Sequence, residues 1–263
     1  MTQPLIENQL LKKLRAGETA LCMTIRISRT IHAVAIARAA GFDSLYVDME
    51  HSQVSFEDTS QLCLAACLAG VTPLVRVASH EHYDINRALD GGAAGVIIPH
   101  VDNAAEAKAC VDACRFPPLG KRSVAGSGAV LGYASLPAAE TSRVLNENIL
   151  VIPMLETPEA IRNADAIAGV EGVDMLLIGT NDLMSEMGIP GQLDHPKVRE
   201  AYAAVAAACK RHKRFLGIGG IKGGAILSEL RAMGAQFLLA RNDEAMLLDA
   251  ANQETKTLRG IFK

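Results

Sequence analysis

The stretch RAAGFDSLYVD, residues 38–48, holds the pattern on which the fold depends. An Ala-rich segment of helical composition ends at a glycine, and a run of apolar and β-branched residues follows within a few positions. Glycine supplies the left-handed residue that often follows a helix, and a nearly continuous apolar run between helices is typical of a strand in a parallel sheet. The same pattern returns in LAGVTPLVRV (68–77), DGGAAGVIIPH (90–100), GVEGVDMLLIG (169–179) and AMGAQFLLAR (232–241).

This pattern predicts eight strands, each followed by a helix, and one further helix at 4–16. Helix start signals agree with it: Ser55 and Asp58 have the spacing of a capping box, and Thr157 before Pro158 fits an N-cap with proline at the first helical position. We expect the strands near 20–27, 44–50, 72–77, 95–100, 150–156, 174–180, 214–219 and 237–242.

Eight strands that alternate with helices form a parallel sheet, either closed into a barrel or open and doubly wound. The length of 263 residues is close to that of one (β/α)8 barrel, about 250 residues. No GxGxxG motif opens the first helix, so the dinucleotide-binding open sheet has no support. We therefore expect an α/β protein, a (β/α)8 TIM barrel that forms a single domain over residues 1–263.

The largest interval between predicted strands follows the fourth strand. Its extra residues, 115–148, are rich in Gly, Pro and Ser. Functional loops of a barrel lie over its active face, so we expect a shaped lid there. The segment FPPLGKRSVAGSG (116–128) suggests a phosphate cradle as an alternative, but it lacks the GK[ST] ending of a P-loop.

Composition excludes several classes of protein. Hydrophobic residues make up 49% of the chain and charged residues 21%, which allows a large core and excludes disorder as the main state. A net charge of −3, 4% aromatic residues and no Trp give no basis for binding nucleic acid or an anionic membrane. The longest uncharged stretch, 62–75, is shorter than the about 20 residues of a membrane span. Without a CxxC pair or a signal peptide, the chain is expected to be cytoplasmic.

Polar residues follow five successive predicted strands at the point where each strand ends. Barrel active sites form at these ends, so the sequence predicts a polar pocket at the barrel mouth. In chain order these residues are Asp48, Glu50 and His51, then Arg76, His100, Glu156, and finally Thr180, Asn181 and Asp182 after Gly179.

Two carboxylates from neighbouring strand ends, Glu156 and Asp182, indicate a metal site. Together with waters they suit a hard octahedral cation such as Mg²⁺ or Mn²⁺, with Co²⁺ as a further option. Asp182 has an alternative role as the cap of the short helix after the sixth strand. No Lys lies at a predicted strand end, which argues against Schiff-base chemistry. A metal that holds a 2-oxo acid and stabilises its enolate is the remaining route to a carbanion.

The other strand ends predict a base and an anion site. Asp48 beside His51 suggests a catalytic dyad in which the carboxylate orients the imidazole. Arg76 suits a substrate carboxylate, which its guanidinium binds in bidentate fashion; the alternative is an internal salt bridge to Glu50 or Asp48. Backbone N–H groups at Gly179 and Thr180 are expected to face the same anion.

Seven segments of the chain resemble, in order, those of the HpcH/HpaI aldolases. They are GFDSLYVDMEHS, LVRV, GAAGVIIPHV, RFPPLGKRS, MLET, EGVDMLLIGTNDL and the Gly-Ile segment at 217–221. The resemblance covers nearly the whole chain. It implies a class II pyruvate aldolase, similar to 4-hydroxy-2-oxoheptanedioate aldolase and the 2-keto-3-deoxy sugar-acid aldolases. It also implies a barrel whose last helix is exchanged between subunits of a homo-oligomer, a hexamer or trimer of dimers.

The resemblance assigns roles to individual residues. The metal ligands fall on Glu156 and Asp182, the pyruvate-binding arginine on Arg76, and the catalytic pair on His51 and Asp48. The turn formed by Gly179, Thr180 and Asn181 would supply backbone contacts to pyruvate. The implied reaction is the reversible retro-aldol cleavage of a 4-hydroxy-2-oxo acid to pyruvate and an aldehyde through a metal-stabilised enolate. Alternatives are a related metal-enolate reaction such as oxaloacetate decarboxylation, and a non-catalytic ligand-binding barrel.

Several positions depart from the family pattern. Many members carry Trp near the end of the first strand, where this chain has Thr24, Ile25 and Arg26. His100 replaces a common Met, Met154 replaces a common Gln, and the eighth strand ends in Arg241, Asn242 and Asp243. The metal and pyruvate half of the expected site is intact, whereas the half that faces the second product is altered. The identity of that product is therefore not inherited from the resemblance.

Overall fold

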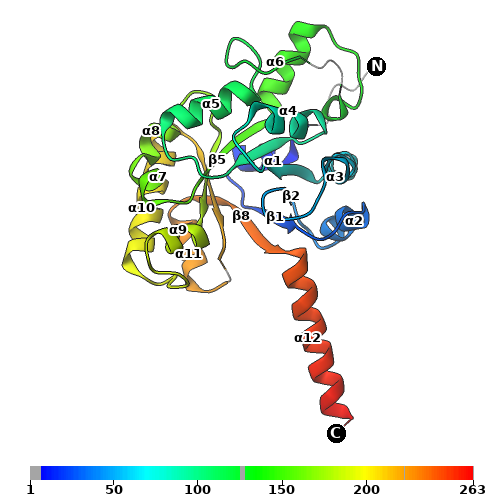
Figure 1. The fold of residues 1–263 in the computed structure, drawn as a ribbon, viewed down its shortest axis with the longest axis vertical. Coiled ribbons are helices and arrows are strands. Elements are labelled where there is room, and N and C mark those ends of the chain that lie inside the picture. The colour runs from blue at the N-terminus through cyan, green and yellow to red at the C-terminus, as the bar shows by residue number, and fades with distance from the viewer. Residues whose placement is uncertain (1–6, 125–127, 222, 263) are drawn as a thin grey trace.

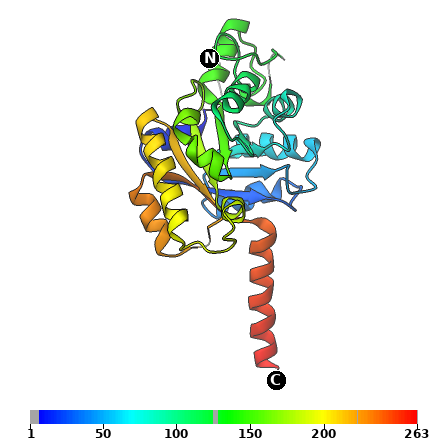
Figure 2. The same cartoon turned by 60° about the vertical axis from the view of Figure 1, so that its left-hand side comes forward.

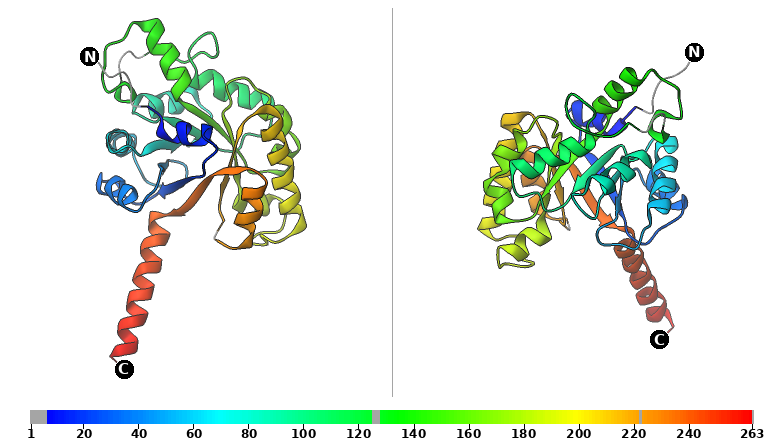
Figure 3. Two further views of the ribbon diagram at one scale, coloured as in Figure 1. Left: turned by 180° about the vertical axis from the view of Figure 1, so that it is seen from behind. Right: turned by 45° about the horizontal axis from the view of Figure 1, so that its top comes forward.

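The computed structural model describes residues 7–124, 128–221 and 223–262 of the chain. Within these residues, eight parallel strands close into a barrel in sequence order, with helices around it (Figure 1 and Figure 3). The predicted (β/α)8 barrel is confirmed, and every strand overlaps its expected range. The strands are β1 (Ala20–Ile25), β2 (Ser44–Asp48), β3 (Thr72–Arg76), β4 (Gly95–Ile98), β5 (Leu150–Leu155), β6 (Met175–Gly179), β7 (Phe215–Gly219) and β8 (Ala235–Asn242).

Helices α3 and α7 begin at the start signals that the sequence contains. Ser55 and Asp58 form a reciprocal capping box, and the Thr157 side chain accepts a hydrogen bond from the Ala160 amide. In the part of the chain that the structure describes, no helix is both long and apolar enough to cross a membrane. The helices are α1 (Gln9–Arg15), α2 (His32–Ala39), α3 (Phe56–Ala69), α4 (His82–Asp90), α5 (Ala104–Cys114), α6 (Ala138–Asn148), α7 (Pro158–Arg162), α8 (Ala164–Ala168), α9 (Thr180–Glu186), α10 (Pro196–His212), α11 (Ala225–Ala232) and α12 (Asp243–Ile261), with a 3-10 turn at Ala129–Leu131.

Alternate residues of the strands enter two separate apolar cores, as expected from the period of two along a strand. One set, which includes Tyr46, Leu74 and Met154, packs inside the barrel against Leu10 and Leu14 of α1. The other set packs under the surrounding helices. Helix α1 therefore closes the N-terminal end of the barrel and leaves the C-terminal end as the open mouth.

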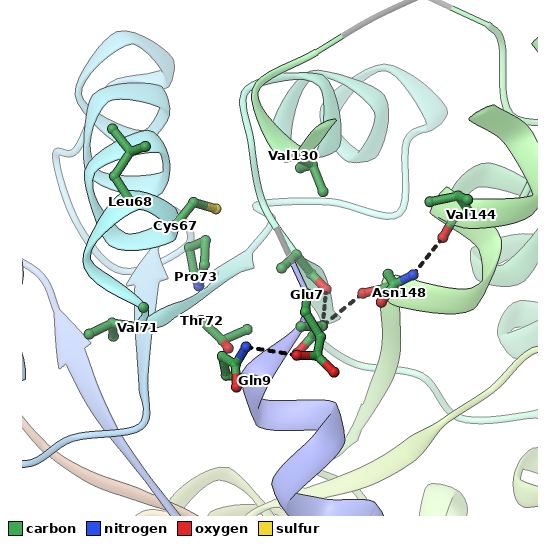
Figure 4. A pocket seen from close by; sticks show the side chains of 13 residues that line it. Glu7, Gln9, Cys67, Leu68, Val71, Thr72, Pro73, Val130, Val144 and Asn148 are labelled. Atoms are coloured by element: carbon green, nitrogen blue, oxygen red, sulfur yellow. Dashed lines mark hydrogen bonds between the residues drawn. The ribbon is translucent and has the colours of Figure 1, made fainter. Parts of the chain in front are cut away.

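Residues 115–148 lie at the closed end of the barrel. The Asn8 side chain, at the start of α1, donates to the carbonyls of Ala94, before β4, and of Asn148, before β5. A hollow of about 720 Å³ at this end is lined by Val130 and Val144 of this segment together with residues that precede β3 and β4 (Figure 4). The expectation of a lid over the active face is therefore wrong for the described part of 115–148; residues 125–127 lie outside it.

The buried side chains of this segment explain its position. Val130, Leu131, Val144 and Leu145 join the core that lies between strands and helices. The buried Arg115 guanidinium donates to the Ile149 carbonyl at 2.8 Å and to the Gly172 carbonyl at 3.2 Å, so it ties the segment to the starts of β5 and β6. The composition of the segment carried no information on which end of the barrel it covers.

Helix α12 follows β8 directly and projects away from the barrel, at the opposite end from α6 (Figure 1 and Figure 2). Of its described residues only Asp243 is buried. Three leucines, Leu247, Leu248 and Leu258, are exposed along it. The helix thus leaves an apolar surface without a partner in the monomer.

Candidate active site

A cavity of about 450 Å³ opens at the mouth of the barrel. Arg26, Asp48, Arg76 and Glu156 each lie two positions beyond a residue of the barrel interior or of the cavity wall, namely Thr24, Tyr46, Leu74 and Met154. The strand period therefore turns these polar residues toward the mouth. The cavity wall includes Arg26, His51, Arg76, Gly179, Thr180, Asn181, Asp182, Arg241 and Asn242.

Glu156 is the most perturbed carboxyl group at the mouth. Its side chain is 1% exposed. Its Oε2 accepts a hydrogen bond of 2.9 Å from the His100 amide, whereas Oε1 is buried without a hydrogen-bond partner in the structure. Burial raises the pKa of Glu156 to about 7; the negative charge of Asp182 adds to this, and the His100 amide opposes it. A buried oxygen without a partner beside a second carboxylate is a place where a cation would be stabilised.

Asp182 lies on the cavity wall in the first turn of α9. Gly179 is the N-cap of that helix, and no side chain caps it, so the alternative role of Asp182 as a helix cap is not observed. Gly179 also separates the cavity from Glu156: a Cβ atom at this glycine would lie 2.7 Å from both Cγ and Oε1 of Glu156. Only glycine leaves Glu156 room at this position.

The two carboxylates fit a divalent cation. Among the described residues, no group of three His, Cys, Asp or Glu side chains completes a metal site. A hard cation needs no such group, because it takes carboxylate oxygens and completes its shell with water or substrate oxygens. The partnerless Oε1 of Glu156 and the neighbouring Asp182 are the donors that this chain supplies.

Asp48 and Arg76 form a buried bidentate pair at the base of the cavity. Arg76 Nε donates to Asp48 Oδ1 at 2.9 Å, and Nη2 donates to Oδ2 at 2.7 Å. Arg76 Nη1 lies 2.8 Å from Glu50 Oε2. Burial alone would raise the pKa of Asp48, but the hydrogen bonds and charge of Arg76 outweigh it and hold the pKa below its ordinary value. The internal salt bridges considered as an alternative role for Arg76 are therefore present, and Arg76 also lines the cavity.

His51 is linked to Asp48 through its backbone. The His51 amide donates to Asp48 Oδ1 at 3.1 Å, while its imidazole is exposed on the cavity wall with Nε2 3.8 Å from Glu50 Oε2. The expected hydrogen bond between the imidazole and Asp48 is not formed in this structure. Asp48 and His51 therefore lie next to each other, but Asp48 orients the backbone of His51 and not its imidazole.

Two further residues, Glu50 and His100, make direct contacts with the proposed site residues, which their places at strand ends did not predict. His100 lies between two carboxylates: its Nε2 is 3.2 Å from Glu50 Oε1 and its Nδ1 is 3.4 Å from Glu156 Oε2. It adopts a positive φ of 51°, which is uncommon for a residue with a side chain. Both residues are the last ones of predicted strands, so their positions were visible in the sequence, but their mutual contacts were not.

The predicted turn at Gly179, Thr180 and Asn181 also lines the cavity. The Thr180 hydroxyl is committed to the buried Tyr202 hydroxyl at 2.8 Å, which anchors the start of α9 on α10. The structure thus gathers every residue that the sequence predicted for the site at one end of the barrel, on or immediately beside one cavity.

Comparisons with known proteins show what the whole chain is similar to. The family model described as HpcH/HpaI aldolase/citrate lyase matches residues 27–218. A 4-hydroxy-4-methyl-2-oxoglutarate aldolase from Hapsidospora irregularis is 40% identical, with 92% of this chain and 91% of that protein covered. A protein of the same name from Chaetomium globosum is 39% identical, with 93% and 92% covered. The crystal structure of an HpcH/HpaI aldolase from Desulfitobacterium hafniense superposes with a TM-score of 0.90 at 34% identity, with 95% of this chain and 96% of that chain covered.

Proposed function

The chain belongs to the HpcH/HpaI aldolase/citrate lyase family and is a carbon–carbon lyase of the aldolase type. We propose that it cleaves 4-hydroxy-2-oxo acids to pyruvate and an aldehyde or ketone with the help of a divalent cation. The observation that carries this proposal is the buried Glu156 Oε1, which has no hydrogen-bond partner in the structure and feels the charge of Asp182, a residue of the cavity wall.

Glu156 and Asp182 are the residues that would hold the cation, with Mg²⁺ or Mn²⁺ as the ions expected for oxygen donors. When bound, the cation would polarise the 2-oxo group and stabilise the negative charge that develops there during cleavage. The His100 amide holds Glu156 Oε2 in place, while Oε1 has no hydrogen-bond partner in the structure, so Oε1 is the oxygen proposed as the ligand.

Arg76 is proposed to hold the 2-oxo acid. Three of its guanidinium nitrogens are fixed by Asp48 and Glu50. A guanidinium has five N–H donors, and among the described residues Arg76 uses only two of them in hydrogen bonds, both to Asp48, so donors remain for a ligand in the cavity that Arg76 lines. The amides of Gly179, Thr180 and Asn181 are proposed as further donors to the same substrate group.

His51 is proposed to move the proton, because its imidazole is exposed on the cavity wall while its backbone is anchored by Asp48. It would accept the proton of the substrate 4-hydroxyl as the C3–C4 bond breaks. The electron pair of that bond passes to C3, which takes up a proton to give the methyl group of pyruvate. The reverse sequence forms the C–C bond.

Assembly into a homo-oligomer, expected as a hexamer, is also a proposal. It is supported by α12, whose apolar residues Leu247, Leu248 and Leu258 are exposed in the monomer. We further expect the enzyme to act in the cytoplasm; its six cysteines are free and buried, in keeping with a reducing compartment.

A screen of 4-hydroxy-2-oxo acids with coupled detection of pyruvate tests the function. EDTA-treated protein should be inactive, and Mn²⁺ or Mg²⁺ should restore pyruvate release together with an equal amount of the second carbonyl product. Activity of metal-free protein, or trapping of a substrate adduct by borohydride, would contradict the metal-dependent mechanism. Oxaloacetate is included in the screen: pyruvate released only from oxaloacetate, without a second carbonyl product, would show decarboxylation in place of aldol cleavage.

A further inference from the structure

Arg26 places a guanidinium at the mouth of the barrel, directly after β1. It lies two residues beyond Thr24, and both line the cavity at the barrel mouth. Its side chain is 33% exposed. The backbone at this point is fixed as well, because the Arg26 amide donates to Asp243 Oδ1 at 2.9 Å.

The Arg26 guanidinium is held from one side only. Its Nε donates to Asp48 Oδ2 at 2.8 Å, and Asp48 is fully buried and bound to Arg76. Neither Nη1 nor Nη2 of Arg26 donates a hydrogen bond to any of the described residues. The two terminal NH2 groups are thus oriented by a rigid anchor and left free for a ligand.

The other arginines of the cavity wall are committed to protein groups. Arg76 is shared by Asp48 and Glu50. Arg241 pairs with Asp249 and donates to the Ala245 carbonyl. Among the arginines of the cavity wall in the described chain, Arg26 therefore has the terminal N–H groups that are most available to bind a further anion.

The topology places Arg26 across the mouth from the proposed cation site. In a closed ring of eight strands, β1 lies opposite β5, and Glu156 follows β5 directly. If a substrate bound through its 2-oxo acid end at Glu156 and Asp182 extends across the mouth toward β1, its far end comes to Arg26.

From these contacts we propose that Arg26 binds a second carboxylate at the far end of the substrate, so that the enzyme prefers 4-hydroxy-2-oxo dicarboxylic acids. This specificity rests on the aldolase function proposed above. A carboxylate matches two terminal N–H donors of a guanidinium in geometry and charge. The 4-hydroxy-4-methyl-2-oxoglutarate for which two relatives are named is an acid of this class.

Cleavage of such a substrate balances without a further reactant. The 4-hydroxyl loses its proton, the C3–C4 bond breaks, and C3 takes up a proton to become the methyl group of pyruvate. C4 becomes a carbonyl group, and the other fragment leaves with its carboxylate; for a 4-hydroxy-2-oxoglutarate, whose second carboxylate is attached to C4, this fragment is a second 2-oxo acid. Arg26 takes no part in proton transfer and acts as a specificity residue.

Binding tests the proposal without catalysis. 2-Oxoglutarate and 2-oxopentanoate have the same chain length, lack the 4-hydroxyl and differ in the terminal carboxylate. With Mn²⁺ present, 2-oxoglutarate should bind wild type at least tenfold more tightly by calorimetry. R26Q should lose this preference, because a charge-assisted hydrogen bond contributes on the order of ten- to a hundredfold in affinity, while R26K should keep part of it. R38Q, which changes an exposed arginine on α2, is the matched control and should behave as wild type.

Kinetics separates specificity from a general effect on Asp48. The kcat/KM for 4-hydroxy-2-oxoglutarate should fall ten- to a hundredfold in R26Q, while that for 4-hydroxy-2-oxopentanoate should change by less than threefold. An equal loss for both substrates would show that Arg26 acts through Asp48 and would overturn the proposal, as would wild-type protein that does not distinguish the two ligands. If wild type binds 2-oxoglutarate preferentially but releases pyruvate from no 4-hydroxy-2-oxo acid, the carboxylate site stands and the aldolase function fails.

Discussion

Asp48 and Arg76 occupy paired positions on the adjacent parallel strands β2 and β3, and both carboxylate oxygens of Asp48 accept hydrogen bonds from the Arg76 guanidinium. Both side chains are almost fully buried. Breaking such a pair leaves an uncompensated buried charge and is strongly destabilising. The pair therefore fixes the floor of the cavity, from which Arg26 and the His51 backbone are oriented.

Replacement of Arg76 by Lys tests its two roles together. R76K keeps the charge but cannot bridge Asp48 and Glu50 while it also faces a ligand. We expect KM for the 2-oxo acid substrate to rise by about tenfold or more, and the melting temperature to fall. Steady-state kinetics and thermal unfolding measure the two effects. A lower melting temperature with an unchanged KM would leave Arg76 with a structural role alone.

The contact between Gly179 and Glu156 predicts that G179A impairs metal binding. The new Cβ would lie 2.7 Å from Cγ and Oε1 of Glu156, so the carboxylate must move from its place beside Asp182. We expect Mn²⁺ affinity to fall at least tenfold by calorimetry, with the fold retained by circular dichroism. G260A is a matched control, because nothing lies within 4 Å of a Cβ at that position; equal Mn²⁺ affinity in both variants would contradict the proposed ligand role of Glu156.

Asp243 predicts a pH-dependent contribution to stability. Its carboxylate accepts hydrogen bonds from the amides of Arg26 and Ser28 at 2.9 and 2.8 Å. Burial alone would raise the pKa of Asp243, but the hydrogen bonds from Ser28, Arg26 and Glu244 outweigh it and lower the pKa below its ordinary value. A lowered pKa in the folded state means that the ionised group stabilises the fold above the ordinary pKa of Asp, about 3.9, and that this contribution is lost as the pH falls through the lower folded value.

The variant D243N should accordingly be less stable than wild type at pH 7 by about 1–3 kcal/mol. The difference should shrink as the pH is lowered below about 4. Urea unfolding of both proteins at pH 7 and pH 3 measures it. E254Q, on an exposed part of α12, is the control, and a D243N difference that grows toward low pH would show that the sign of the shift is wrong.

The exposed face of α12 predicts an oligomer. Leu247 and Leu248 are 63% and 58% exposed in the monomer, and burying them against another subunit would recover the free energy of transfer from water, about 25 cal/mol per Å². We expect light scattering to show an oligomer at micromolar concentration, and L247E/L248E to lower its mass. L68E, at an exposed leucine of α3, should leave the mass unchanged. A monomeric wild-type protein would contradict the prediction.

The fold was predictable because its signals are local. A glycine after a helix and an apolar run after the glycine recur before five of the eight strands, and barrel closure follows from the number of predicted strands and the chain length. The position of residues 115–148 was not predictable, because it depends on which buried contacts Arg115 and Val144 make far along the chain. A loop's composition shows that it is a loop and leaves its packing partners undetermined.

The site was predictable as a set of positions and less so as a set of contacts. Strand ends meet at one face of a barrel, so Glu156, Asp182 and Arg76 had to converge. The pairing of Asp48 with two arginines instead of the His51 imidazole depends on side-chain reach at the mouth, which one-dimensional spacing does not specify. Arg26 was visible as a departure from the family pattern, and its free donors became apparent only from the three-dimensional contacts.

His51 provides the sharpest test of the mechanism. We expect H51A to lower turnover by about 10²–10⁴-fold, as is usual for a general acid–base group, while metal affinity and pyruvate affinity stay within about threefold of wild type. H51A should also slow the exchange of pyruvate methyl protons with D2O, measured by proton NMR with Mn²⁺ replaced by diamagnetic Mg²⁺. This exchange reports proton transfer at C3 and needs no knowledge of the second product.

The D48N variant separates positioning from proton transfer. Asp48 touches the His51 amide and not its imidazole, so D48N should slow exchange less than H51A does, and it should also weaken pyruvate binding because Arg76 loses its bidentate partner. H195A, which changes a histidine far along the chain before α10, should exchange at the wild-type rate. If H51A also exchanges at that rate, His51 is not the base for this step. His100, whose imidazole lies between Glu50 and Glu156, would then be the next histidine to replace.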